Sequence, residues 1–464
     1  MRELVIRVME ILRETESRVR VGGEVGERFW TARGVRQGCP LSPMLFNLLT
    51  ANLEERMGKV KWGGVKVKGE RIYSLSYADD MVLLAEDEVG MKSMIARLED
   101  YLDGKRLELN ERKTKIIRFR KGGGREKKVI WRWKGKVIEE VKEFTYLGYN
   151  IQKNGGQERH VRERVRKAAA VMGQVWGIGK RRFGKDWGRR LWLFDRLVWT
   201  VMSYGVEIWG WKERDKMERL EERYLRWMLG VDKWTPAYLV REELQKEKLR
   251  IRAGRRVWSF ERRLEEGRGS NLARKCWEEM RERAKVGKAG SDWERERKKF
   301  FEERGKKVEE VEEKREEGVD WFEDVLKEDR KKQREERREK IEGSSYNKWY
   351  KMVKGEGIPG YLKKEWGESR CIRVARFRLG NEMRASKYWE REEAVMCRLC
   401  GSGTETWEHV WEECREWKKE KGSWQEEVRW ILSEEGEGEW WMRKVDEERG
   451  GKTRGEGEES REGE

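Results

Sequence analysis

At 464 residues the chain can hold two or three domains, since a domain usually takes roughly 100–200 residues. Charged residues make up 43% of it against 36% hydrophobic, so we expect much solvated helix or disordered segment and only a partly compact chain. The formal charge of +18 is uneven: residues 1–260 hold 58 Lys and Arg against 37 Asp and Glu, and residues 261–464 hold 50 against 53. Residues 101–200 hold 28 against 11, which fits a polyphosphate partner, with a merely soluble basic surface as the alternative.

The cellular setting can be inferred from hydropathy and cysteine spacing. The N-terminus is charged and amphipathic, so the protein is not expected to be secreted. The most apolar window is Leu191–Trp211, and its uncharged run, 197–206, is too short to cross a bilayer, which needs about 20 residues. It predicts a buried helix and no membrane contact. The six Cys are not spaced as a disulfide framework, which favours a reducing, intracellular setting, nucleus or cytoplasm.

Taken in chain order, the first elements alternate between helices and strands. A helix at Leu4–Leu12 and a hairpin turning at Gly22-Gly23 come first. After the Gly34–Pro43 loop a helix should begin, with Ser42 as N-cap and Pro43 at the first helical position. The further predicted elements are strands at Ile72–Tyr77, Met81–Ala85, Ile116–Phe119, Val129–Trp133 and Phe144–Ile151, and a helix at Val89–Leu102. This alternation predicts an α+β fold.

Beyond Arg159 the strand signals vanish and a long amphipathic helix is predicted. Residues 275–342 mix Glu, Lys and Arg, a composition typical of salt-bridge-laced helix or of disorder, and we interpret them as a spacer. The last residues, Gly450–Glu464, form a tail of Gly and Glu with nothing to bury. The 26 Trp can either pack in cores or stack on bases and guanidinium groups.

Two adjacent aspartates, Asp79 and Asp80, follow Tyr77-Ala78 at the predicted turn between apolar strands. Like charges held together repel, so a cation or protonation must offset them. Mg²⁺ prefers such hard oxygen ligands and keeps substrate phosphates in its shell. The pair therefore indicates a Mg²⁺ site, although an Asp-Asp turn with ordinary solvated carboxylates has the same four residues.

The surrounding motifs decide between these alternatives. Four segments match, in order, motifs B, C, D and E of reverse transcriptases: Gly34–Pro43, Tyr77–Asp80, Leu107–Lys115 and Phe144–Gly148. Farther on, Tyr204–Trp209 and Leu225–Val231 are similar to the thumb and following segment of LINE- and jockey-type elements. The chain therefore resembles a non-LTR retrotransposon reverse transcriptase over roughly residues 1–255.

The resemblance implies roles for individual residues. Asp79 and Asp80 would hold Mg²⁺ for an RNA-directed DNA polymerase, in the two-metal scheme, and Lys113 would neutralise the leaving pyrophosphate, unless it is a plain surface lysine. The residues implied to bind nucleotide and template are Gln37, Gly38, Pro40, Ser42 and Tyr77, and those of the primer grip are Tyr146, Leu147 and Gly148. An ordinary Gly-Pro turn is the alternative for the loop.

The resemblance to reverse transcriptases is incomplete upstream of Gly34. The family needs a third carboxylate, the motif A aspartate, before motif B, and none of the glutamates in the first 33 residues has a suitable context. We therefore expect a chain truncated before motif B, without fingers, with little or no polymerase activity alone. Two carboxylates are a poor cage for two Mg²⁺ ions, and the missing strand would leave an unpaired edge. An upstream fragment could supply motif A, or the gene could be read too short.

A second motif lies near the C-terminus. Cys397, Cys400, His409 and Cys414 give C-x2-C-x8-H-x4-C, the ligand types and spacing that tetrahedral Zn²⁺ takes. The motif resembles the CCHC finger of the same elements, which implies a structural, nucleic-acid-facing zinc site. Unligated thiols beside a histidine are the alternative. Trp407 and Trp411 flank His409 and could stack on bases or pack over the metal.

The predicted organisation has five parts. They are a partial palm at 1–155, a helical thumb-like region at 156–270, a charged helical spacer at 271–395, a CCHC zinc finger at 396–420, and a helical to disordered tail at 421–464. The expected partners are an RNA template and a DNA primer. The rival hypothesis is a non-catalytic nucleic-acid-binding protein that uses the basic region and the finger, with the palm as a relic.

Overall fold

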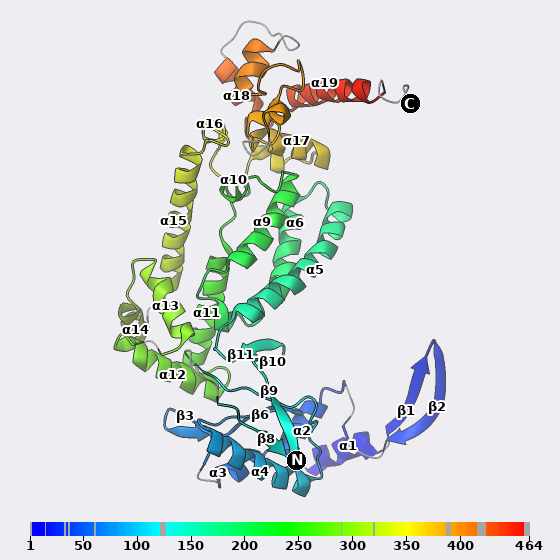
Figure 1. The fold of residues 1–464 in the computed structure, drawn as a ribbon, viewed down its shortest axis with the longest axis vertical. Coiled ribbons are helices and arrows are strands. Elements are labelled where there is room, and N and C mark those ends of the chain that lie inside the picture. Colours follow the sequence, from blue (N-terminus) through cyan, green and yellow to red (C-terminus); the bar gives the residue numbers. More distant parts are fainter. Residues whose placement is uncertain are drawn as a thin grey trace. The chain divides into compact units, whose positions relative to one another are not determined.

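The computed structural model describes residues 2–13, 15–31, 34–35, 38–59, 62–120, 127–288, 290–318, 321–386, 391–414 and 424–458. The chain divides into two compact units, Met1–Gly155 and Gly156–Glu464, drawn from blue to cyan and from cyan to red in Figure 1. The first unit mixes helices with small sheets, and the second is helical. None of the described helices combines the length and the apolar character that crossing a membrane requires.

The first unit contains short helices and hairpins. Its helices are α1 (Arg2–Arg13), α2 (Ser42–Leu49), α3 (Leu53–Gly58) and α4 (Glu88–Lys105). Its strands are β1 (Thr15–Val21), β2 (Glu24–Thr31), β3 (Val65–Val67), β4 (Glu70–Ile72), β5 (Ser74–Tyr77), β6 (Asp80–Leu83), β7 (Lys115–Ile116), β8 (Trp131–Trp133), β9 (Lys136–Glu140), β10 (Glu143–Tyr146) and β11 (Tyr149–Gln152). They form four two-stranded antiparallel sheets and one three-stranded sheet in the order β7-β9-β8.

The core of the first unit lies between α4 and the three-stranded sheet. Asp87 caps α4 by accepting a 2.7 Å hydrogen bond from the Gly90 amide. Because a Cβ at Gly90 would lie 2.9 Å from the Gly63 backbone, only glycine lets these segments approach so closely. The buried core side chains are Leu53, Met57, Met94, Ile95, Leu98, Tyr101, Leu102, Ile116, Trp131, Trp133 and Ile138.

Several predictions for this unit needed correction. The strand predicted at Phe144–Ile151 is a hairpin, β10 and β11, because Leu147 and Gly148 both have positive φ, 46° and 78°, and reverse the chain. Ser42 is not the N-cap of α2: it is the first helical residue, and Leu41 precedes it without a side-chain cap. The hairpin at Gly22-Gly23 is confirmed.

The second unit begins with the long helix predicted after Arg159, α5 (Glu158–Arg182). The apolar window Leu191–Trp211 is not one helix, because a π-turn at Phe194–Val198 and the left-handed Gly205 interrupt it. Its helices are α6 (Trp187–Leu193), α7 (Trp199–Met202) and α8 (Val206–Trp209). The following helices are α9 (Asp215–Leu229), α10 (Ala237–Glu243), α11 (Leu249–Glu265), α12 (Asn271–Lys285), α13 (Asp292–Glu302), α14 (Val308–Glu316), α15 (Phe322–Glu342), α16 (Tyr350–Val353), α17 (Glu368–Arg378), α18 (Trp424–Ile431) and α19 (Glu439–Glu458).

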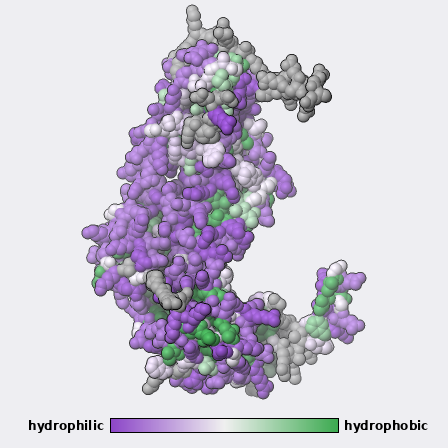
Figure 2. Space-filling view, in the orientation of Figure 1, coloured by the Kyte–Doolittle hydropathy of each residue, from purple (hydrophilic) through white to green (hydrophobic). Residues whose placement is uncertain are grey.

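The charged region interpreted as a spacer is helical, and its helices share a buried aromatic core. Helices α11 to α15 bury aromatic side chains, among them Trp258, which stacks on Phe322 with ring centroids 4.6 Å apart. Arg297 is buried between α11 and α14, where it donates to Glu261 at 2.9 Å and to Glu312 at 2.6 Å. The visible surface of this unit is mainly hydrophilic (Figure 2). Charged side chains of these helices therefore lie both on the surface and in the buried core.

The first half of the last helix packs against the Cys/His region. Trp441 of α19 is fully buried, and its ring stacks at 5.8 Å on Trp407. Arg449, 5% exposed, donates a 2.8 Å hydrogen bond to buried Glu405. Residues 459–464 lie outside the described residues. The C-terminal helix is thus part of the same packed region as the Cys/His motif.

Candidate functional site

The two aspartates lie at the tip of the β5–β6 hairpin. Tyr77 pairs with Asp80, so Ala78 and Asp79 form a two-residue turn. Ala78 has a φ of 53°, in the left-handed region that a non-glycine residue seldom adopts. Both aspartates are exposed. The hairpin therefore presents two adjacent carboxylates to solvent.

Two polar residues of neighbouring helices hold this hairpin in place. Asn47 of α2 accepts a 3.0 Å hydrogen bond from the Ala78 amide through its side-chain oxygen. Glu54 of α3 accepts bonds from the Tyr73 amide (2.7 Å), the Ser74 amide (3.0 Å) and the Ser74 hydroxyl (2.6 Å). Sequence reasoning missed both residues. The only available signal was a polar residue inside each short helix near the motif.

Tyr146 of the predicted primer-grip turn has a shifted pKa. Burial raises the pKa of Tyr146, and the negative charge of Asp80 raises it further, so the Tyr146 hydroxyl lies within electrostatic range of Asp80. Leu147 and Gly148 form the tight turn that follows. Tyr146 therefore senses the charge of Asp80, although the two residues are far apart in the sequence.

The other predicted site residues differ in exposure and in backbone conformation. Gly38 has a φ of +80° and open space where a Cβ would be, and Pro40 is exposed beside it. Ser42 is buried. Tyr77 is 59% exposed, and Lys113 is exposed in the turn that follows Asn110, whose side chain accepts the Lys113 amide at 3.2 Å. Gln37 lies outside the described residues.

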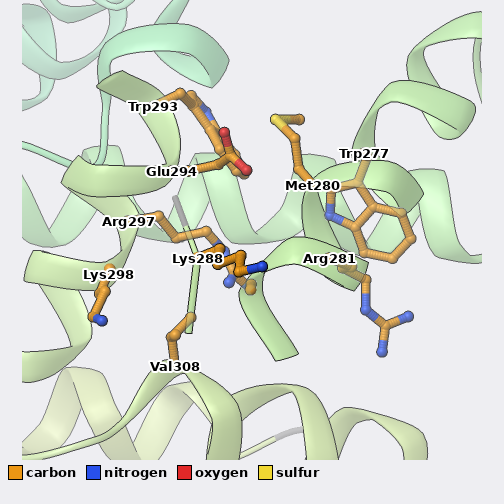
Figure 3. A pocket seen from close by; sticks show the side chains of 10 residues that line it. Trp277, Met280, Arg281, Lys288, Trp293, Glu294, Arg297, Lys298 and Val308 are labelled. Carbon is orange, nitrogen blue, oxygen red and sulfur yellow. The ribbon is translucent and has the colours of Figure 1, made fainter. Parts of the chain in front are cut away.

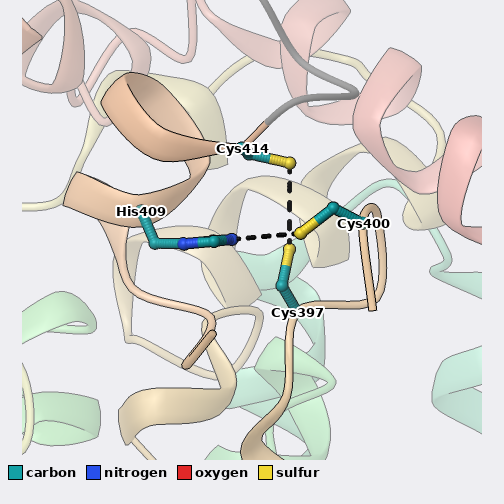
Figure 4. Close-up of side chains that lie close together, drawn as sticks. All are labelled: Cys397, Cys400, His409 and Cys414. Atoms are coloured by element: carbon teal, nitrogen blue, oxygen red, sulfur yellow. Dashed lines mark hydrogen bonds between the residues drawn. The ribbon is translucent and has the colours of Figure 1, made fainter. Parts of the chain in front are cut away.

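The Cys/His motif forms a compact cluster. One ligand atom each from Cys397, Cys400, His409 and Cys414 lie within 4.8 Å of one another, the only such group of three or more in the described part of the chain (Figure 4). The Cys397 and Cys414 sulfurs are 4.0 Å apart, and the Cys400 sulfur is 3.3 Å from His409 Nε2. Tetrahedral Zn²⁺ with Zn–S bonds of about 2.3 Å separates two sulfurs by about 3.8 Å. The four residues therefore fit a Zn²⁺ ion.

The environment of the cluster also fits a metal. His409 Nδ1 lies 3.1 Å from a Glu413 carboxylate oxygen, the partner that orients many metal-binding histidines. Burial raises the pKa of the Cys397 thiol to about 12. Burial acts upward at Cys400 as well, but hydrogen bonds with Ser402 and His409 outweigh it and lower that pKa to about 6. A divalent cation would offset the cost of ionising Cys397.

Trp407 is buried and packs against Trp441 of α19. Its ring is 5% exposed and stacks on Trp441, so it cannot also stack on a base. Trp411 lies 5.8 Å from the same ring. The aromatic residues beside His409 therefore support the fold around the metal ligands.

Two hollows of the second unit are not candidate ligand-binding sites. The first, between α12, α13 and α14, holds about 10 Å³, room for a single water at most, and is lined by Trp277, Arg297 and their neighbours (Figure 3). The second holds about 390 Å³, and its charged lining has as many acidic as basic side chains, as Glu213 beside Arg250 illustrates. Such a balanced lining selects neither anions nor cations.

Comparisons with known proteins agree with the resemblance to reverse transcriptases. Residues 4–151 match the family described as "Reverse transcriptase (RNA-dependent DNA polymerase)". The chain is 34% identical over 148 residues, 32% of its length, to 14% of the "Retrovirus-related Pol polyprotein from type-1 retrotransposable element R2" of Nasonia vitripennis. It is 27% identical over 228 residues, 47% of its length, to 36% of the like-named protein of Popillia japonica, a match too long to end at residue 151. It is also 31% identical, over 29% of its length, to 13% of the type-2 R2DM protein of Drosophila melanogaster.

Residues 4–151 are thus a reverse-transcriptase region of the retrotransposon kind, as the sequence predicted, and the non-catalytic rival is not favoured. The chain spans between 13% and 36% of the length of these three relatives.

Proposed function

We propose that the first unit is the part of a reverse-transcriptase palm that carries motifs B to E and takes part in RNA-directed DNA synthesis on an RNA template and a DNA primer. In this proposal Asp79 and Asp80 bind Mg²⁺, which would supply charge neutralisation for phosphoryl transfer. Tyr146, Leu147 and Gly148 hold the primer end. The thumb-like role belongs to the first helices of the second unit, beginning with α5.

The observation that carries this proposal is the fixed presentation of the two carboxylates. Asn47 binds the backbone of the turn at Ala78, so the carboxylates project from a tip whose position α2 determines. Tyr146 lies within electrostatic range of Asp80, which supports a primer end held next to the metal ligands. Gly38 has open space beside its Cα, which supports close passage of a nucleotide. Lys113 and Gln37 keep the roles that the family resemblance implies.

The polymerase needs a third carboxylate. Among the described residues, Asp79 and Asp80 do not gather with a third acidic, His or Cys side chain. The proposal therefore assigns the motif A aspartate to a segment beyond those described residues, such as an upstream fragment acting in trans. Activity of the 464-residue chain alone is expected to be weak.

The test is primer extension with Mg²⁺ on an RNA template, with the full chain alone and with an added polypeptide carrying the motif A segment of an R2 Pol polyprotein. Extension that Asp79→Asn abolishes supports the proposal. Asp100→Asn is the matched control, because Asp100 is also exposed in the first unit but lies on α4. Salt-sensitive RNA binding without extension under either condition would overturn the polymerase role and leave the nucleic-acid binder.

We further propose that Cys397, Cys400, His409 and Cys414 hold one structural Zn²⁺. Four ligands fill the tetrahedral shell, and Glu413 beside His409 favours a fixed histidine orientation. Zinc-binding thiols must stay reduced, so we place the protein inside the cell, in nucleus or cytoplasm.

A further inference from the structure

The β1–β2 hairpin of the first unit has no core. It forms a two-stranded sheet by itself, and every residue from Arg18 to Trp30 is exposed. Figure 1 draws the hairpin as two arrows, β1 and β2, and the space-filling view in Figure 2 shows both hydrophobic and hydrophilic residues on it. An isolated hairpin is marginally stable in water. Its two faces therefore need a covering partner or must serve as a contact surface.

The strand register sorts its side chains onto two faces. Glu16 pairs with Trp30, Arg18 with Arg28, and Arg20 with Val25. The pairing steps two residues along β1 and three along β2, so the extra residue is in β2 and β1 keeps its alternation. One face, which we call the arginine face, carries Arg18, Arg20, Arg28, Trp30, Glu16 and Val25. The opposite face carries Ser17, Val19, Val21, Glu24 and Phe29.

The arginine face has an excess of positive charge. Arg18 is paired with Glu16 at 2.8 Å, whereas Arg20 and Arg28 have no ion-pair partner among the described residues. Arg18 and Arg20, two residues apart on one strand, are separated by about 6.8 Å, and Arg28 lies across from Arg18. Trp30, 61% exposed, follows Arg28 by two residues on the same face. Three guanidinium groups beside one open indole ring form a short cationic and aromatic platform.

We propose that the arginine face binds single-stranded nucleic acid, with Arg18, Arg20 and Arg28 on successive phosphates and Trp30 stacked on a base. Guanidinium groups pair with phosphate oxygens through fork-shaped hydrogen bonds, and an exposed indole stacks on any base. The charge of the face is complementary to a polyanion, which is why nucleic acid is favoured over a second protein. This contact is separate from the proposed polymerase site and does not depend on its activity.

The test measures binding of fluorescent oligonucleotides to the full chain by anisotropy over a range of salt concentrations. Each phosphate contact on a single strand contributes about 0.7 to the slope of log K against log salt. The triple variant Arg18→Gln, Arg20→Gln, Arg28→Gln should therefore lose about 2 from that slope. Trp30→Ala should weaken binding by roughly 5- to 100-fold with an unchanged slope, since stacking is not ionic.

A charge-matched control separates this surface from general electrostatics. Lys331, Arg334 and Lys340 are exposed on α15 of the second unit, so their triple replacement by Gln changes net charge equally. It should leave the slope nearly unchanged. Arms with RNA, single-stranded DNA and duplex DNA show which strand is preferred, and the two single strands should bind more tightly than the duplex.

Three results would overturn the proposal. The wild-type chain could fail to bind any single strand, the hairpin triple variant could keep the wild-type slope, or the α15 variant could lose as much. Self-association that the same hairpin substitutions abolish, with nucleic-acid binding intact, would instead assign this surface to a second copy of the chain. Because the hairpin contributes nothing to either core, unchanged circular dichroism should verify that the variants fold.

Discussion

Replacing Glu243 should strongly destabilise the second unit. Glu243 is 1% exposed, and its carboxylate accepts four hydrogen bonds. Two come from Arg378, at 2.7 and 3.2 Å, and one each from the Tyr350 and Tyr361 hydroxyls, at 2.8 and 2.9 Å. Burial raises the pKa of both tyrosines well above its usual range, so both hydroxyls stay donors.

In Glu243→Leu all four donors lose their acceptor, and the fully buried Arg378 keeps a charge without a counter-ion. Breaking a buried ion pair by removing one partner costs about 3–5 kcal/mol. With a urea dependence of about 3 kcal/mol per molar, the unfolding midpoint should fall by more than ~1 M. Adding Arg378→Met removes the uncompensated charge, so the double variant should recover part of the loss.

Urea unfolding of the full chain followed by tryptophan fluorescence measures this change. Glu317→Leu is the matched control: Glu317 is exposed at the end of α14, and its loss should cost less than about 0.5 kcal/mol. A midpoint of Glu243→Leu equal to that of the control would refute the assigned role of the four bonds. So would a double variant less stable than Glu243→Leu, because an unpaired buried charge would then not be the source of the cost.

Three further predictions concern metal, pH and the turn. Cys400→Ser should lower the zinc content, measured by atomic emission, below one equivalent per chain and should reduce the melting temperature. Chelation of the wild-type chain should have the same two effects. A zinc content of the variant equal to that of the wild type would contradict the site. Burial raises the pKa of Glu218 to about 8 in the folded chain, above its value in the unfolded chain. Folding therefore binds a proton between pH values of about 4.5 and 8. The free energy of unfolding should fall as the pH rises through this range, by at most ~1.4 kcal/mol per pH unit. Glu218→Gln should flatten this dependence in urea unfolding between pH 6.5 and 8.5, and an unchanged slope would refute it. Ala78→Gly relieves the left-handed backbone at the turn and should stabilise the first unit by up to about 1 kcal/mol, whereas a lower melting temperature would contradict the strain.

The local features were predictable from the sequence. The Gly22-Gly23 turn and α5 follow from short-range turn chemistry and from helical periodicity, and the structure has both. The gathering of Cys397 with its three partner ligands also follows from close spacing, because few residues separate the ligands. In each case the interacting groups are neighbours in sequence, so the chain itself limits where they can be.

The contacts between residues far apart in the sequence were not predictable in the same way. Asn47 reaches Ala78 across 31 residues, and Glu243 reaches Arg378 across 135. A polar residue inside a short helix is expected to be solvated until its partner is known. The burial of Arg297 against Glu261 was unpredictable for the same reason, because composition counts charges but not which of them pair.

The zinc motif and the last helix behave as one structural element. Glu405, fully buried between Cys400 and His409 in the sequence, accepts hydrogen bonds from Arg398 at 2.7 Å and from Arg449 of α19 at 2.8 Å. Trp441 of α19 packs on Trp407, two residues before His409. An ion that holds the four ligands would therefore also hold the surface on which α19 packs. Zinc binding should then stabilise the packing of α19, and packing of α19 should strengthen zinc binding by the same free energy. A finger free to swing on a linker would show neither contact, so a metal bound to these four ligands would hold the end of the second unit together with α19.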